Sequence, residues 1–487
     1  MSVDYDVIIF GATPAGIQAA IAAATLKARV ALITQGISSQ AAPELTRHQA
    51  LLHLAHTTEQ LQHAQSLPLR KSFESPSLVP SVPWKQVDLW LQQVAANIAA
   101  SYSVAGLAYQ GVDVIPAMGE FCRQPAFGVR VGDRLLQARG YLVAIDARTQ
   151  IPAIAGLDSV GYLTPETLFD DLTLLANCQK IAVIGSSKTA IELGQALNQL
   201  GIEITILTQA PRLLPDGDRD LSQILQAQLE ADGMQLSLST TIDQIRERSG
   251  TKQIAIGATL LEIDEIMVAT ALRSDLAALN LDTIGVRWDG QSIWHNQKLQ
   301  TTHPRIYVCE GRVGDEWFTQ VAIAEAAVAL KNILFFPWFK INDNSIPLTV
   351  HTFPELAWIG LTEEQALRIY GQRRVYILRQ SFHTLPKAQM TDNLTGFCKL
   401  VVHRDGTLLG AHIFGACASE WIGILALAMQ QQLKIGAIAA LAIPSPTFAA
   451  ILQQSASQFR SLQLKHNSFQ QDLIDHFFDL RRAWSRS

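Results

Sequence analysis

Two glycine-containing turns carry the clearest chemical signal in this chain. The first is DVIIFGATPAG, in which Gly11 and Gly16 flank Thr13, and the second is KIAVIGSSKTA, which contains Gly185 and Ser187. A glycine turn between a strand and a helix lets the amides of the helix N-terminus approach a pyrophosphate. Both turns therefore predict dinucleotide binding, although each has a hydroxyl residue where the middle glycine is expected.

The segments around both turns have the hydrophobic pattern of βαβ units. Residues 5–10 (YDVIIF) and 29–34 (RVALIT) are apolar runs typical of buried strands, and an alanine-rich helix separates them. KIAVIG, KTAIELGQALNQLG and EITILT repeat this pattern over residues 180–208. Parallel strands joined by helices predict an α/β fold with two Rossmann-like domains, one for a resident cofactor and one for a mobile cofactor.

The remaining segments predict how these units are completed. Residues 35–100 are expected to be mostly helical, and residues 128–148 to form a hairpin followed by a strand. EIMVATALR (265–273) and RIYVCEGRVGD (305–315) are expected to return as strands to the first sheet. From about residue 345 the pattern favours a separate α+β domain with an antiparallel sheet.

Composition excludes several classes of protein. A chain of 487 residues predicts about three domains. The net charge of −5 gives no basis for nucleic-acid binding, and no apolar run is long enough for a membrane span. A charged share of 17% favours a large buried interface with a second copy. The scattered cysteines predict a soluble cytoplasmic protein with buried thiols and no metal site: Cys122, Cys178, Cys309, Cys398 and Cys417.

The last 22 residues, 466–487, predict an amphipathic helix. Its apolar residues recur every three or four positions and form one stripe: Phe469, Leu473, Phe477, Leu480 and Trp484. Packing of this stripe on its own domain is the favoured interpretation. Docking of a partner and binding to a membrane surface are the alternatives.

The order of these segments resembles the pyridine nucleotide–disulfide oxidoreductases, the group of dihydrolipoamide dehydrogenase, mercuric reductase and glutathione reductase. The resemblance covers residues 3–460 and rests on collinear phrases such as YDVIIFGATPAG, APRLLP, FPELAWIGLTEEQA and LLGAHIFGACASEWI. It implies a homodimer. It also implies an FAD-binding-type domain (1–155 and 273–343), an NAD(P)-binding-type domain (156–272) and a dimerisation domain (344–465), before the C-terminal helix.

The resemblance fails where the family's thiol chemistry is expected. Members with disulfide activity have a Cys-x4-Cys after the first βαβ unit, and the match places Gln40 and Leu45 at these cysteines. Gln49 stands at the flavin-facing lysine. Neither replacement forms a thiolate, so thiol–disulfide exchange is excluded at this site. The partner's His and Glu fall at Ser445 and Ala450, and no catalytic residue is identified.

The cofactor contacts implied by the resemblance are also altered. The FAD pyrophosphate would lie at four residues, with two more near the ribose: Gly11, Thr13, Ala15 and Gly16, then Thr34 and Gln35. The NAD(P)H site would be lined by Gly185, Ser187, Glu192 and Thr208. In the family Glu192 pairs with the lysine position, here Gln49. An ordinary local hydrogen bond of Glu192 is the alternative.

Two acids complicate the FAD site. Asp146 stands where the family has a glycine, which predicts repulsion of a pyrophosphate unless the local path differs. The family's Gly-Asp, whose acid contacts the flavin ribitol, falls at Glu310-Gly311 in direct register. Asp315 replaces the missing acid if the loop shifts.

Two functions are compatible with this pattern. The first is an FAD-dependent NAD(P)H oxidoreductase without disulfide reductase activity, which passes electrons to an unknown acceptor such as a quinone, a dye or a protein partner. The flavin carries that chemistry, so few side chains are required. The alternative is a non-catalytic homodimer that keeps the fold for binding or regulation, with or without FAD.

Overall fold

The structure is a computed structural model that describes residues 3–34, 41–64, 82–274, 276–314, 316–465 and 468–484. The chain forms two compact units. Unit 1 consists of Met1–Asp216 and Leu225–Asn342, and unit 2 consists of Gly217–Ile224 and Asp343–Ser487. Each unit has its own sheets and its own hydrophobic core. The finer division into three domains stays a prediction.

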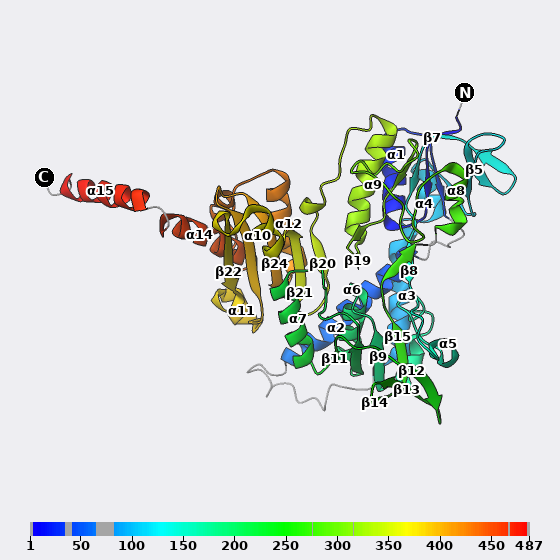
Figure 1. The fold of residues 1–487 in the computed structure, drawn as a ribbon, viewed down its shortest axis with the longest axis horizontal. Coiled ribbons are helices and arrows are strands. Elements are labelled where there is room, and N and C mark those ends of the chain that lie inside the picture. Colours follow the sequence, from blue (N-terminus) through cyan, green and yellow to red (C-terminus); the bar gives the residue numbers. More distant parts are fainter. Residues whose placement is uncertain are drawn as a thin grey trace. The chain divides into compact units, whose positions relative to one another are not determined.

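The first turn lies in a five-stranded parallel sheet of unit 1 (Figure 1). The predicted strands on both sides of the turn are confirmed, and α1 (Pro14–Thr25) connects them. The segment RIYV also joins this sheet, as predicted. From edge to edge the strands are β17 (Ile306–Val308), β7 (Ala138–Val143), β1 (Tyr5–Phe10), β2 (Val30–Ile33) and β3 (Val112–Ile115).

Side chains of β1 alternate between two cores, as expected for a strand covered on both faces. Val7 and Ile9 belong to the core that contains residues of α1 and α9 (Thr319–Leu334). Ile8 and Phe10 belong to the core on the other face, which contains residues of a small antiparallel sheet, β4-β5-β6. All four side chains are fully buried. Burial of each stabilises the fold by roughly 1.5–3 kcal/mol and fixes the end of β1, where the turn begins.

The second turn lies in a four-stranded parallel sheet. The predicted strand, helix and strand around this turn are confirmed. The strands in order are β11 (Gln235–Ser237), β10 (Glu203–Leu207), β9 (Lys180–Ile184) and β15 (Glu265–Val268), and α6 (Lys188–Gln199) follows β9.

The prediction that the segment EIMV returns to the first sheet is wrong. β15 pairs in parallel with β9 in the second sheet, and Val268 lies opposite Ile184. Ile266 and Val268 share one core with Ala182 and Ile184. Burial of these apolar side chains beside β9 therefore holds β15 in the second sheet.

The remaining elements of unit 1 agree with the predicted pattern where the structure describes them. The helical region contains α2 (Ala41–Ala64) and α3 (Trp84–Ala100), and the predicted hairpin is β5-β6. The other elements are α4 (Val104–Tyr109), β4 (Glu120–Cys122), β5 (Gly128–Val131), β6 (Arg134–Leu136), β8 (Ala147–Thr149), α5 (Leu157–Val160), β12 (Gln244–Arg248), β13 (Thr251–Ile256), β14 (Thr259–Ile263), β16 (Leu272–Ser274), α8 (Leu281–Ile284), β18 (Arg312–Val313) and β19 (Glu316–Trp317).

Unit 2 has the predicted antiparallel sheet with helices. The strand order is β20-β21-β24-β23-β22, and α7 (Arg219–Ala231) begins in this unit and continues into unit 1. Its core combines side chains of the sheet with side chains of α12 and α14. The elements are β20 (Leu348–Val350), β21 (Glu355–Gly360), α10 (Glu363–Tyr370), β22 (Val375–Ser381), α11 (Pro386–Thr391), β23 (Phe397–His403), β24 (Leu408–Gly415), α12 (Ala418–Gln430), α13 (Ile435–Ala439), α14 (Ala450–Lys465) and α15 (Ser468–Trp484).

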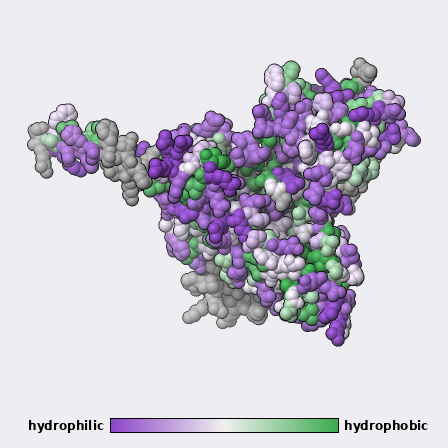
Figure 2. Space-filling model, viewed as in Figure 1, coloured by the Kyte–Doolittle hydropathy of each residue, from purple (hydrophilic) through white to green (hydrophobic). Residues whose placement is uncertain are grey.

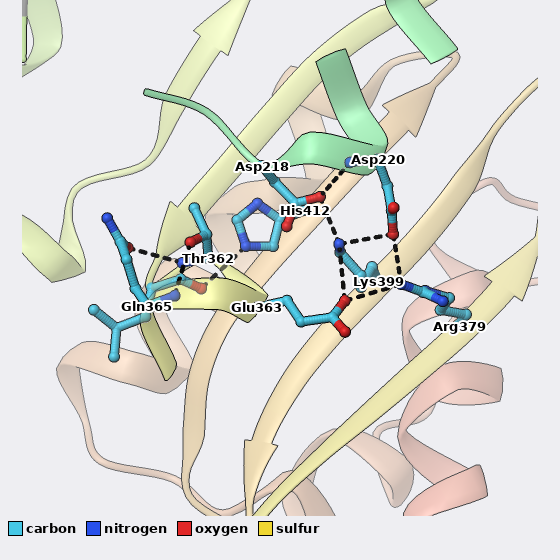
Figure 3. Close-up of polar contacts among 9 residues, drawn as sticks. Asp218, Asp220, Thr362, Glu363, Gln365, Arg379, Lys399 and His412 are labelled. Carbon is cyan, nitrogen blue, oxygen red and sulfur yellow. Dashed lines mark hydrogen bonds and ion pairs between the residues drawn. The ribbon is translucent and has the colours of Figure 1, made fainter. Parts of the chain in front are cut away.

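A buried lysine joins the start of α7 to this sheet (Figure 3). The Lys399 side chain is 1% exposed and donates to Asp218, to Asp220 at 2.9 Å and to Glu363 at 3.3 Å. Arg379 also bonds Asp220 and Glu363. A buried ammonium group requires such partners, so the network fixes segment 217–224 on β23.

A histidine of β24 lies beside this network. His412 is fully buried, and its Nε2–H donates to the Leu361 carbonyl at 3.0 Å. Burial lowers the pKa of His412 below its ordinary value. Burial opposes ionisation of Asp218, but His412 and Lys399 more than offset it, and the pKa of Asp218 lies below its ordinary value. The network therefore has a structural role, since its ion pairs hold the start of α7 on the sheet of unit 2.

The favoured packing of the C-terminal stripe on its own domain is wrong for the side chains that are described. Leu473, Phe477, Leu480 and Trp484 on α15 are 56–86% exposed. Hydrophobic and hydrophilic side chains share the visible face of this helix (Figure 2). Within the described residues the stripe is not buried, because the helix residues 472–484 are all exposed. Docking of a partner and membrane binding stay predictions.

Candidate functional site

Both glycines of the first turn are required by close packing. Gly11 has φ +101°, and a Cβ there would lie 2.2 Å from the Ala144 carbonyl oxygen. A Cβ on Gly16 would lie 2.1 Å from the carbonyl oxygen of Gly11. Any side chain at either position would thus push α1 away from the ends of β1 and β7.

Thr13 replaces the middle glycine with a helix cap. Its hydroxyl accepts from the Gly16 amide at 3.1 Å and donates to the Ala144 carbonyl at 2.9 Å. Pro14 is the first helical residue and has no N–H. The Ala15 amide, in the first turn of α1, has no partner in the described part of the chain. One amide and the helix dipole thus remain for an anion.

The end of β2 also leaves a hydroxyl available. Thr34 is 8% exposed, and its amide donates to the Ile115 carbonyl at 3.1 Å. Its hydroxyl makes no hydrogen bond within the ranges that the structure describes. Gln35, the second residue expected near the ribose, lies outside the described residues. The ribose contacts of this pair stay predictions.

The second turn repeats the geometry of the first. Gly185 has φ +128°, and a Cβ there would lie 2.3 Å from the Ala269 carbonyl oxygen. Ser187 accepts from the Ala190 amide at 3.1 Å and donates to the Ala269 carbonyl at 2.7 Å. In both turns the residue at the middle position is therefore an N-cap that also binds the neighbouring strand.

Polar groups of the second turn are occupied by the chain itself. The Lys188 amide, at the first position of α6, donates to Oε2 of Glu316 at 3.0 Å. The Thr208 hydroxyl donates to the Ser186 hydroxyl at 3.0 Å and accepts from the Ala210 amide at 3.2 Å. The groups expected to line an NAD(P)H site thus already have partners.

Glu192 is paired, but with residues that sequence reasoning missed. Its side chain is 1% exposed, and Lys188 Nζ lies 3.0 Å from Oε1. Nε2 of His48 on α2 lies 3.4 Å from Oε2. Gln49, the expected partner, is exposed on the same helix. The local alternative for Glu192 is therefore correct, and the i,i+4 spacing of Lys188 and Glu192 was the available signal.

The sequence match places the family's cysteine pair at Gln40 and Leu45, neither of which is a thiol, and this placement stays a prediction. Leu45 is half-buried on α2, and Gln40 lies outside the described residues. All five cysteines are free, and Cys417 is exposed, against the expectation of buried thiols. Cys417 begins α12 at φ +56°, in a turn at the surface of unit 2, which explains its exposure.

Burial makes most of these thiols poor nucleophiles. It raises the pKa of Cys178 to about 11 and that of Cys398 to about 12. Burial also raises the pKa values of Cys309 and Cys417 above the ordinary range. Since the thiolate is the reactive form, these four residues are unsuited to disulfide exchange near neutral pH.

Three carboxyl groups gather beside the first turn. Burial raises the pKa of Glu44 on α2; Arg47 opposes this shift, while Asp146 and Glu166 add to it. Burial also raises the pKa of Asp146, and Glu166 adds to it. The Asp146 side chain nonetheless keeps accessible surface. Asp146 lies two residues beyond Ala144, whose carbonyl oxygen accepts from the Thr13 hydroxyl of the first turn.

The acid near the family's ribitol position is engaged elsewhere. Oε1 of Glu310 accepts from the Ile293 amide at 2.7 Å, and burial raises the pKa of Glu310. The Gly311 amide donates to Glu325 at 2.7 Å. Asp315, the alternative acid, lies outside the described residues.

The described ranges hold neither a cluster suited to a metal ion nor a helix suited to crossing a membrane. Within them, no group of three or more His, Cys, Asp or Glu side chains is arranged to hold a metal ion. No helix in the same ranges has the length and hydropathy of a bilayer-crossing segment.

Proteins of known sequence share this architecture. Residues 5–330 match the family described as pyridine nucleotide-disulphide oxidoreductase, and residues 346–456 match its dimerisation domain. A mercuric reductase of Staphylococcus aureus is 27% identical over 469 residues, which cover 94% of this chain and 82% of that protein. A dihydrolipoyl dehydrogenase of Bacillus subtilis (strain 168) is 26% identical over 467 residues, which cover 92% and 97%.

Solved structures share the fold. LpdA from Mycobacterium tuberculosis superposes with a TM-score of 0.82 at 22% identity, covering 93% of this chain and 99% of that chain. The flavoprotein disulfide reductase RclA from Escherichia coli gives 0.78 at 20% identity, covering 94% and 100%. The predicted fold class, with two dinucleotide-binding regions and a dimerisation domain, is confirmed.

Proposed function

Because the chain belongs to the pyridine nucleotide–disulphide oxidoreductase family, we propose that it is an FAD-dependent NAD(P)H oxidoreductase without a dithiol step. Members of this family bind FAD and use NAD(P)H. The observation that carries the proposal is the absence of thiols at positions 40 and 45, together with the raised thiol pKa values elsewhere. Electrons then leave for an acceptor other than a disulfide.

The residues of the first turn fit FAD. Gly11 and Gly16 hold α1 close to the strand ends, and the Ala15 amide with the helix dipole would hold the pyrophosphate. The open hydroxyl of Thr34 binds a ribose hydroxyl. A bound flavin supplies hydride acceptance from a nicotinamide and onward electron transfer. Hydroxyl contacts replace the family's acidic residue, so the expected affinity is lower than that of a charge-assisted contact.

The carboxyl groups beside the first turn supply protons. Burial raises the pKa values of Glu44 and Asp146, and the charge of Glu166 adds to both shifts. A carboxyl group with a raised pKa is a suitable proton donor for reduction of a quinone or a dye. In this proposal Glu44 holds the proton on its carboxyl oxygen.

The matched dimerisation domain supports a homodimer through residues 344–465.

The decisive experiment is an absorbance spectrum followed by an oxygen-free titration with NADH and NADPH. A flavin band that bleaches supports the proposal. The reduced protein should then pass electrons to a quinone but not to oxidised lipoamide or mercuric ion, the reactions implied by the names of the two relatives. A colourless full-length protein would instead support the non-catalytic homodimer.

Thiol chemistry has its own test. Alkylation of the protein before and after reduction should label the same cysteines to the same extent, since no disulfide opens during the reaction. A mixed disulfide with substrate, identified by mass spectrometry at any of the five cysteines, would contradict the proposal.

A further inference from the structure

The N-terminus of α6 carries a carboxylate from a distant part of the chain. Glu316 on β19 accepts from the Lys188 amide at 3.0 Å, although 128 residues separate the two. Ser187 occupies the Ala190 amide in the same turn of the helix. The first and third amides of α6 thus already have acceptors, and one acceptor is negatively charged. An anion at a helix N-terminus is stabilised both by the amides and by the dipole.

The hairpin β18-β19 positions this carboxylate. Val313 pairs with Glu316 across the hairpin, and Gly314 in the turn has φ +61°. A Cβ on Gly314 would lie 2.4 Å from Oδ2 of Asp216. The left-handed backbone at Gly314 favours glycine, although the flexible Asp216 side chain could move away from an added Cβ.

The positive charge nearest to this helix terminus is already used. Lys188 Nζ bonds both carboxylate oxygens of Glu192 at 3.0 and 3.1 Å, and its side chain is 16% exposed. The two negative charges of a pyrophosphate would thus be repelled by Glu316. They would not be neutralised by the ammonium group of Lys188, which is bonded to Glu192. Repulsion and loss of the amide both oppose binding while Glu316 stays in place.

We propose that Glu316 competes with the pyrophosphate of NAD(P)H for the N-terminus of α6 and sets the affinity for the nucleotide. The nucleotide binds when this carboxylate leaves the Lys188 amide. The apparent affinity is then reduced by the fraction of molecules in which the amide is free. This inference rests on the NAD(P)H site of the proposed function and names the residue that controls access to it.

The first turn has no corresponding competitor. Pro14 at the equivalent helical position offers no N–H, and no carboxylate bonds the start of α1 among the described residues. This difference implies that a cofactor can stay bound at α1. At α6 a nucleotide can bind only when it displaces the carboxylate of Glu316.

The test measures binding of ADP-ribose, which has the pyrophosphate but no nicotinamide, to the full-length protein by isothermal titration calorimetry. Glu316→Gln keeps an acceptor but removes the charge, and Glu316→Ala removes both. A hydrogen bond to a charged group is lost, so ADP-ribose should bind about tenfold more tightly to both variants than to the unchanged protein. NADH should show the same order of affinities.

The matched control is Glu120→Gln, which removes the same charge from a partly exposed side chain on β4 that pairs with Arg130. It should leave the affinity for ADP-ribose unchanged. Equal affinity in all proteins, or no binding even to Glu316→Ala, would overturn the role of Glu316. Binding of ADP-ribose needs no electron transfer, so this result is separate from bleaching of the flavin band. If ADP-ribose binds with the predicted affinities but NAD(P)H does not reduce the flavin, only the proposed function is overturned.

Discussion

The turn after β1 and the turn after β9 have nearly the same backbone but different occupants. In each, a glycine with positive φ lies against a carbonyl of the neighbouring strand, and a hydroxyl residue caps the following helix. In the first turn Ala15 and Thr34 keep polar groups without partners in the described chain. In the second, Glu316 occupies the helix and Thr208 is bonded to Ser186.

This difference shows that loss of the middle glycine does not decide the chemistry of either turn. Thr13 and Ser187 make the same pair of hydrogen bonds and consume the same third amide of their helices. The distinction comes from residues outside the motifs, above all Glu316. The number of glycines in each motif therefore does not predict which turn can bind a ligand. That depends on the tertiary contacts that each turn makes.

The largest expected effect comes from adding a methyl group to the first glycine of each turn. Both Gly11→Ala and Gly185→Ala place a residue with a side chain at an unfavourable positive φ. The added Cβ would lie 2.2 Å from a carbonyl oxygen in Gly11→Ala and 2.3 Å from one in Gly185→Ala. Each should lower the free energy of unfolding by on the order of 4 kcal/mol, measured by urea denaturation. The remaining folded protein should lose flavin with Gly11→Ala but keep it with Gly185→Ala.

Gly257→Ala is the matched control for these two variants. Gly257 also has positive φ, at +57°, but no atom lies within 4 Å of an added Cβ. Only backbone strain of about 1 kcal/mol is expected there. A loss as large as that of Gly11→Ala would show that strain, not the contact with β7, requires the glycines.

Breaking the ion pair behind the second turn should have the next largest effect. Lys188→Met removes the ammonium group that bonds both carboxylate oxygens of Glu192, whose side chain is 1% exposed. The loss should be on the order of 3 kcal/mol in the free energy of unfolding. Lys180→Met removes an equally charged residue from an exposed pair with Glu203 and should change stability little. Similar losses for both variants would contradict a specific role of the buried pair.

Local elements of both turns were predictable from sequence, whereas their distant partners were not. The apolar runs of β1 and β9 and the patterns of α1 and α6 depend on neighbouring residues, so they could be identified directly. The sheet that β15 joins depends on competition between two distant edges. The bond of Glu316 to Lys188 spans 128 residues and leaves no periodic signal. Among these polar contacts of the second turn, the i,i+4 spacing of Lys188 and Glu192 is the one that the sequence reveals.

The junction of α2 with α6 should make the second region sensitive to pH. Burial and repulsion from Asp232 raise the pKa of Glu59 to about 7, although a hydrogen bond from Gln199 opposes this shift. The folded protein thus binds a proton that the unfolded chain releases near pH 4.5, so stability falls as pH rises through about 7. Glu59→Gln should abolish this fall.

The measurement is urea denaturation of both proteins at acid and mildly alkaline pH. At about pH 8, Glu59→Gln should be more stable than the unchanged protein by on the order of 1 kcal/mol, since Glu59 is only partly buried. At about pH 5 the two should differ little. Equal pH profiles would show that Glu59 is hydrated in the folded protein.

The smallest expected effect comes from removing the two N-caps, Thr13 and Ser187. It tests whether the two turns contribute equally to stability. Thr13→Ala and Ser187→Ala each remove a helix cap and should cost about 1 kcal/mol in the free energy of unfolding. Their ligand effects should differ, because Thr13→Ala frees the Gly16 amide in an otherwise open turn, whereas Ser187→Ala leaves Glu316 on Lys188. Flavin should therefore be held more tightly by Thr13→Ala, while ADP-ribose affinity should be unchanged in Ser187→Ala. A gain in ADP-ribose affinity from Ser187→Ala alone would assign the closure of the second turn to its cap and not to the carboxylate of Glu316.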